Sequence, residues 1–76
     1  MTEIEAALDR LDATVASLYR AEDSEEFFCA VVRGRKALQT AESVLAEKEP
    51  VYGEDALLPY HERYNAAEAA FMEAVR

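Results

Sequence analysis

The stretch SEEFFCAVVRGRKALQTAESVLAEK, residues Ser24 to Lys48, is the segment against which we expect the rest of the chain to pack. With a turn of about 100° per residue, its apolar residues fall within one broad sector, which is typical of a helix that buries one side. We therefore predict that it is the central helix of a small bundle. The sector consists of Phe27, Ala30, Val31, Gly34, Ala37, Leu38, Ala41, Val44 and Leu45.

Gly34 stands inside this sector, where a glycine costs about 1 kcal/mol relative to alanine in a helix. One interpretation is that a neighbouring helix needs the space, and an aromatic ring is the simplest candidate to fill it. The other is that Gly34 is a tolerated weakness or a slight kink. The sequence leaves both open.

The residues before this stretch predict a first helix from Thr2 to about Arg20 or Ala21. Its apolar stripe follows three- and four-residue steps, and it consists of Ile4, Ala7, Leu8, Leu11, Thr14, Val15 and Leu18. Glu5, Asp9 and Asp12 gather on one flank. This flank is either an ordinary solvated face or an acidic docking strip.

A short acidic connection joins the first two helices. Asp23 or Ser24 can cap the second helix, and carboxylates in its first turn interact favourably with the helix dipole. Because capping uses at least two of the four carboxylates, we predict no metal site here. So short a link makes the two helices antiparallel neighbours. The carboxylates are Glu22, Asp23, Glu25 and Glu26.

Beyond the central stretch, Pro50 predicts that the second helix ends near Lys48 or Glu49. Gly53 gives a turn, and Pro59 fits the first turn of a third helix that starts between Asp55 and Leu58. The core stripe of this helix consists of Leu57, Tyr60, Tyr64, Ala67, Phe71, Ala74 and Val75.

The expected fold is all-α, a single domain over residues 1–76, built as an antiparallel three-helix bundle. We expect its helices at about 2–21, 24–48 and 56–76. The alternative is a long helical hairpin of the first two helices that dimerises into a four-helix bundle through Phe28 and Val32. In that case the third helix is splayed or packed across the hairpin.

The central helix also has apolar residues outside its core sector, namely Phe28, Cys29 and Val32. They need cover from the third helix or from a second chain, because an exposed apolar patch usually marks a contact surface. The neighbouring Arg33, Arg35 and Lys36 either pair with carboxylates of the other helices or recognise an acidic partner. We predict a partner-binding site made of Phe28, Cys29, Val32, Arg33, Arg35, Lys36, Glu22, Asp23, Glu25 and Glu26.

Composition and charge limit the functions that we expect of this protein. The formal charge of −8 repels phosphate backbones and anionic membrane surfaces, so we expect no direct nucleic-acid or membrane binding. The acidic N-terminus has no signal-peptide pattern, and the lone Cys29 cannot form an intrachain disulfide, which favours a reducing, cytoplasmic location. The residues show no catalytic, cofactor-binding or metal-binding motif, and we predict no enzymatic activity.

The function that we expect is a small acidic interaction module, which binds a larger protein or itself. The alternative is an acidic inhibitor that mimics nucleic acid and blocks a nucleic-acid-binding protein or a defence complex. Salt dependence separates the two, because a mimic relies on charge for its affinity.

Overall fold

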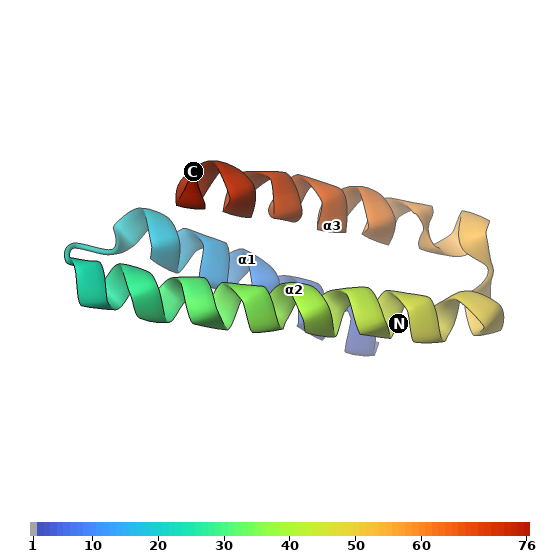
Figure 1. The fold of residues 1–76 in the computed structure, drawn as a ribbon. Helices are drawn as coiled ribbons and strands as arrows, with labels where there is room; N and C mark the ends of the chain where they lie inside the picture. The colour runs from blue at the N-terminus through green and yellow to red at the C-terminus, as the bar shows by residue number, and fades with distance from the viewer. Residues whose placement is uncertain (1) are drawn as a thin grey trace.

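The computed structural model describes residues 2–76, which form three α-helices: α1 (Thr2–Arg20), α2 (Ser24–Tyr52) and α3 (Glu54–Val75) (Figure 1). Each helix packs on the other two, and the molecule measures 42 × 17 × 15 Å. Successive helices run in opposite directions, so the predicted antiparallel three-helix bundle is confirmed. The splayed or crossing third helix of the alternative is wrong, because α3 packs along both α1 and α2, while dimerisation through Phe28 and Val32 stays a prediction.

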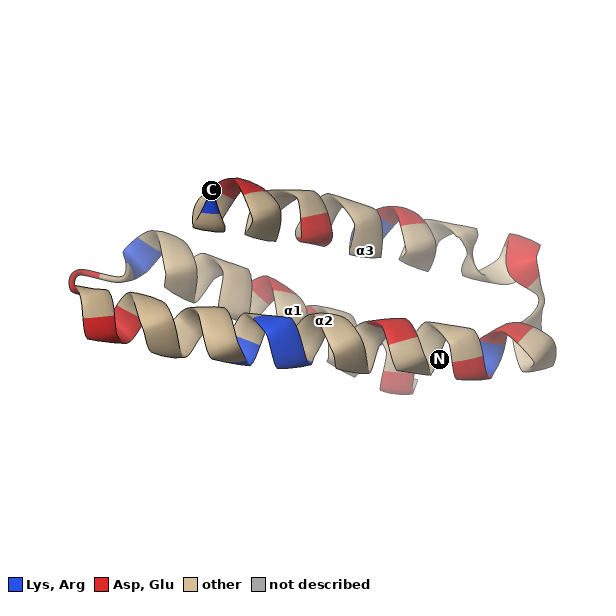
Figure 2. Ribbon diagram, viewed as in Figure 1, with Lys and Arg blue, Asp and Glu red and all other residues tan. Residues whose placement is uncertain are grey.

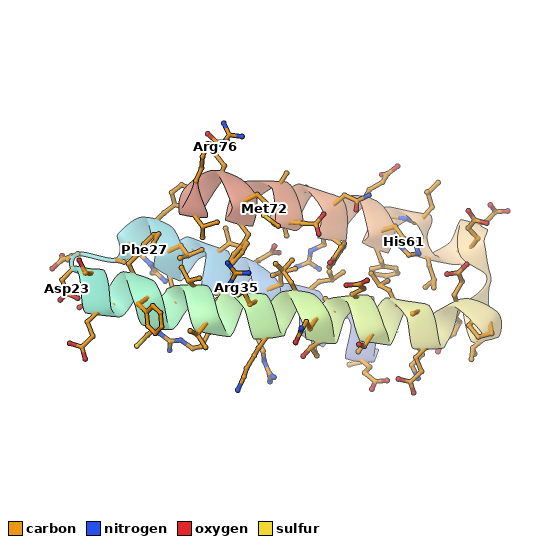
Figure 3. The ribbon with its side chains drawn as sticks, in the orientation of Figure 1. Asp23, Phe27, Arg35, His61, Met72 and Arg76 are labelled. Atoms are coloured by element: carbon orange, nitrogen blue, oxygen red, sulfur yellow. The ribbon has the colours of Figure 1, made fainter. Side chains whose placement is uncertain are left out.

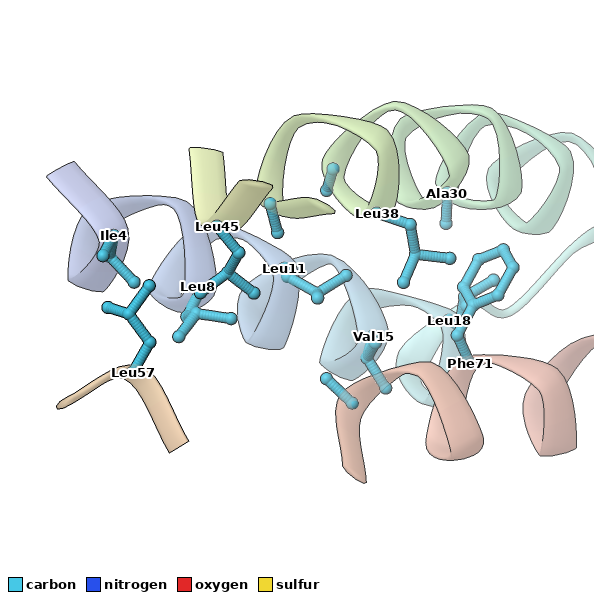
Figure 4. Close-up of a cluster of buried hydrophobic side chains, with 13 residues drawn as sticks. Ile4, Leu8, Leu11, Val15, Leu18, Ala30, Leu38, Leu45, Leu57 and Phe71 are labelled. Atoms are coloured by element: carbon cyan, nitrogen blue, oxygen red, sulfur yellow. The ribbon is translucent and has the colours of Figure 1, made fainter. Parts of the chain in front are cut away.

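The core is entirely apolar in the described residues and draws on all three predicted stripes. Ile4, Leu45 and Leu57 meet at one end of the bundle, while Leu18 and Phe71 meet at the other (Figure 4). The periodicity therefore identified the buried face of each helix. The buried apolar side chains are Ile4, Leu8, Leu11, Val15, Leu18, Ala30, Ala37, Leu38, Ala41, Leu45, Leu57, Ala67 and Phe71.

Gly34 makes room for an aromatic ring, as the first of its two interpretations predicts. A Cβ placed on Gly34 would overlap the ring of Phe71, with the ring atom Cδ2 at 2.9 Å. Phe71 is buried against α2 at this point, so the missing side chain lets α2 and α3 approach closely.

The predicted end of the second helix near Lys48 is wrong, because α2 continues through Pro50 to Tyr52. Proline removes one N–H, which would otherwise bond the carbonyl of Ala46. Ala46 and Pro50 are both exposed, so water can satisfy that carbonyl and the helix tolerates the loss. The helix ends instead at Gly53, whose N–H donates to the carbonyl of Glu49 at 2.8 Å.

Gly53 alone connects α2 to α3, and its φ of 89° lies in the region that favours glycine. The third helix starts at Glu54, before the predicted range, so Pro59 lies beyond its first turn rather than inside it. The carbonyl that Pro59 leaves unpaired belongs to Asp55, which is exposed to solvent. The first turn of α3 is set off from the rest of the helix near this proline (Figure 1).

Arg63 of α3 joins the acidic flank of α1. Its guanidinium donates to Asp9 Oδ1 at 2.6 Å and to Asp12 Oδ2 at 2.7 Å. These hydrogen bonds raise the pKa of Arg63 above its ordinary value. The flank, expected to be a solvated face or a docking strip, thus contributes to the packing of α1 on α3.

Further polar contacts link the helices along their edges. The Lys48 ammonium lies 3.1 Å from the Glu3 carboxylate, and the Tyr60 hydroxyl donates to Glu5 at 3.2 Å. At the other end, the Tyr19 hydroxyl donates to the carbonyl of Ala70 at 3.2 Å. The bundle is therefore tied together at both ends.

Candidate functional site

Phe28, Cys29 and Val32 form an exposed group on α2, which we call the apolar patch. Phe28 has 67% of its surface exposed and Val32 has 41%, and Cys29 is exposed as well. Phe27, one residue earlier, is half-buried and turns toward the interior (Figure 3). The third helix therefore does not supply the cover that the patch was expected to need.

The helical repeat explains this position. The buried face of α2 packs into the groove between α1 and α3, and it carries Leu38, Ala41 and Leu45. Phe28 and Val32 lie on the opposite side of the helix, because they are rotated by more than a quarter turn from that sector. The patch is thus a direct result of the sequence order along α2.

The patch borders a hollow surface. One shallow depression is lined by Phe28, Cys29, Val32 and Arg33. It adjoins an open groove between the end of α1 and the start of α2, and the two share Cys29 and Arg33. The groove is also lined by Ser17, Arg20, Ala21, Asp23, Glu25, Glu26 and Ala30. Apolar and charged surfaces are therefore contiguous here.

Arg33, Arg35 and Lys36, the basic cluster, follow the patch along α2 (Figure 2). The expectation that they pair with carboxylates of the other helices is wrong, because none of the three forms an ion pair among residues 2–76. The interhelical pairs use Lys48 and Arg63 instead. The charges of the basic cluster remain available to solvent or to a partner.

The acidic turn, Glu22, Asp23, Glu25 and Glu26, precedes the patch. Asp23 is the N-cap of α2 and accepts a hydrogen bond from the Glu26 N–H at 2.8 Å. The Glu26 carboxylate in turn accepts from the Glu22 N–H at 3.2 Å. Asp23 and Glu26 therefore stabilise the start of the helix, as the expectation for two of the four carboxylates stated. Glu25 is exposed and takes no part in these bonds.

Several groups with shifted pKa values lie where the helices pack on one another. Burial and the neighbouring Glu5 raise the pKa of Tyr60, and burial and Glu68 raise that of Tyr64. The hydrogen bond to Glu3 raises the pKa of Lys48. Each of these groups belongs to the packing of the helices and lies outside the patch. In residues 2–76, His, Cys, Asp and Glu side chains nowhere converge in a group that could hold a metal ion.

Two features were missed at the sequence level. Arg63 is the one Lys or Arg residue within α3, and Asp9 and Asp12 stand three residues apart on one helix face. Together these features could have predicted the pairing. A second exposed apolar group lies near Gly53, where Val51 is 68% exposed and Leu58 is 53% exposed. The early ending predicted for α2 placed Val51 in a loop and concealed this group.

Comparisons with models of known protein families, with curated proteins and with solved structures gave no match. None of the three described helices has a segment long and apolar enough to cross a lipid bilayer.

Proposed function

We propose that this protein is a small, non-enzymatic helical module that acts in the cytoplasm through protein–protein interaction. Its contact surface is the apolar patch together with the charged residues on either side. The observation that carries this proposal is the 67% exposure of Phe28, the most exposed aromatic side chain in the described residues.

Energetics support a contact role for this position. Removing a large apolar side chain from water gives about 1.5–3 kcal/mol, and exposed Phe28 gains little of this in the single chain. Aromatic and arginine side chains are also common anchors of protein interfaces. Phe28, with Arg33 beside it, provides both kinds of group on one rigid helix.

The test compares two substitutions at positions of equal exposure. Phe28→Asp introduces a charge into the patch, and Val51→Asp does the same at a site that is 68% exposed near the other end of α2. Circular dichroism establishes that both variants keep their helical content. Binding is then measured by light scattering, for association of the chain with itself, and by capture from a lysate of the native host.

We expect Phe28→Asp to abolish whichever association the wild type shows, and Val51→Asp to preserve it. Association that is the same in the wild type and in Phe28→Asp would refute the proposal, as would the absence of any association in the wild type.

A nucleic-acid mimic is the alternative function, and the exposed Glu22 and Glu25 are the observation that favours it. The basic cluster lies about two to four helical turns away, however, and interrupts the negative surface that such a mimic needs (Figure 2). A mimic would lose most of its affinity in high salt and on reversal of Glu25, whereas an apolar contact would change little with salt.

A further inference from the structure

Along the first half of α2, the side chains on the exposed face change in type from acidic to apolar to basic. The order runs from acidic Glu25, through apolar Phe28 and Val32, to basic Lys36. These four residues stand three or four positions apart, so they lie along one face of the helix. The segment spans about 16 Å at 1.5 Å per residue.

Two copies of this face complement each other when they run in opposite directions. When a second α2 is laid antiparallel across the first with the centre near residues 30 and 31, Phe28 of each copy faces Val32 of the other. The same alignment sets Glu25 of each copy opposite Lys36 of the other. Every contact then occurs twice, which is the property of a two-fold symmetric interface.

We propose that the partner that this surface fits is a second copy of this chain, bound through an antiparallel contact between the two α2 helices. The inference rests on the proposed function and names the partner. A parallel contact would place Glu25 on Glu25 and Lys36 on Lys36, and like charges at an interface are repulsive. Charge order thus selects the antiparallel arrangement.

The surroundings of the patch permit this contact. α1 and α3 both pack on the buried side of α2, so neither stands between two α2 helices that meet through their exposed sides. Charges on both sides of Phe28 and Val32 are free of ion pairs among residues 2–76. An interface along half of one helix is small, so we expect a weak, reversible dimer.

Sedimentation equilibrium over a series of protein concentrations measures the self-association. We expect a monomer–dimer equilibrium for the wild type. Phe28→Asp should weaken it by about 30-fold, the loss expected for an interface hot spot, while Val51→Asp should leave it unchanged. Circular dichroism confirms that each variant is folded.

Charge reversal tests the orientation. Glu25→Lys alone and Lys36→Glu alone each create two repulsive pairs and should weaken the dimer by about tenfold. The double variant Glu25→Lys with Lys36→Glu restores both pairs in the antiparallel arrangement, with no change in net charge, and should dimerise like the wild type. Failure of the double variant to recover would overturn the antiparallel contact.

Cys29 gives an independent readout, because the alignment sets the two thiols on the same side of the interface. A short bis-maleimide should link wild-type chains into covalent dimers and should not link Phe28→Asp chains. A wild type that stays monomeric and unlinked would overturn this inference. The proposed function would then stand only if capture of a different protein depended on Phe28, so the two failures are distinguishable.

Discussion

Replacing Gly34 with alanine sets two opposing effects against each other. Alanine favours the helix by about 1 kcal/mol over glycine. Its Cβ, however, would overlap the ring of Phe71, with Cδ2 at 2.9 Å. Phe71 is fully enclosed in the core, so the ring cannot swing into solvent, and overpacking of this kind costs about 1–3 kcal/mol. We expect Gly34→Ala to lower the free energy of unfolding by about 1 kcal/mol.

Urea unfolding followed by circular dichroism measures this change. A domain of this size has a stability of roughly 4–11 kcal/mol, so a loss of 1 kcal/mol shifts the midpoint clearly. Ala66→Gly is the control, because Ala66 is exposed in the middle of α3 and reports the helix preference without any steric contact. It should lose about 1 kcal/mol.

A double-mutant cycle isolates the contact between residues 34 and 71. Phe71→Leu should cost less stability in the Gly34→Ala background than in the wild type, with a coupling of about 1 kcal/mol. If Gly34→Ala instead gained the full helix preference, and the cycle showed no coupling, the close approach of α2 and α3 at Gly34 would be refuted.

Three further predictions follow from the contacts between helices and from the helix ends. Arg63→Met should lower the free energy of unfolding by about 1 kcal/mol in low salt and by less in high salt, whereas Arg10→Met, at an exposed position without an ion pair, should be neutral. Equal losses in both variants would contradict the bridge to α1. Pro50→Ala should raise the urea midpoint, because it restores a hydrogen bond to a helix that already continues past this position; a lower midpoint would show that proline holds the end of α2. Because the raised pKa values of Tyr60 and Tyr64 let the unfolded chain ionise first, stability should fall as pH rises above the ordinary tyrosine value of 10.0. Urea midpoints measured up to about pH 11 check this, and a constant midpoint would contradict it.

The core could be predicted from the sequence because burial follows a helical period that is visible in the residues themselves. The space for Phe71 beside Gly34 was also foreseeable, since a glycine in an apolar helix face needs an explanation. Proline positions were harder to interpret. Pro50 and Pro59 each remove a single hydrogen bond at a solvated position, and the surrounding packing outweighs that loss.

The charged residues of the candidate site could not be assigned from the sequence. Which carboxylates meet which cations depends on the rotation of each helix about its axis, and this is fixed only when the cores pack. Arg63 therefore forms ion pairs with Asp9 and Asp12, whereas Arg35 forms none among the described residues. The exposure of Phe28 was foreseeable only as one of two options, because α3 can in principle cover either side of the hairpin.

The single residue between α2 and α3 fixes the positions of their side chains relative to one another along the bundle. Gly34 stands nineteen positions before Gly53, and Phe71 stands eighteen positions after it. Because the two helices are joined by this one turn, the glycine and the ring lie at nearly the same height along the bundle axis. One residue inserted into α3 between Gly53 and Phe71 would advance the rest of that helix by about 1.5 Å and rotate it by about 100°. Surface connections usually accept added residues, but an insertion within α3 would move the ring away from its recess.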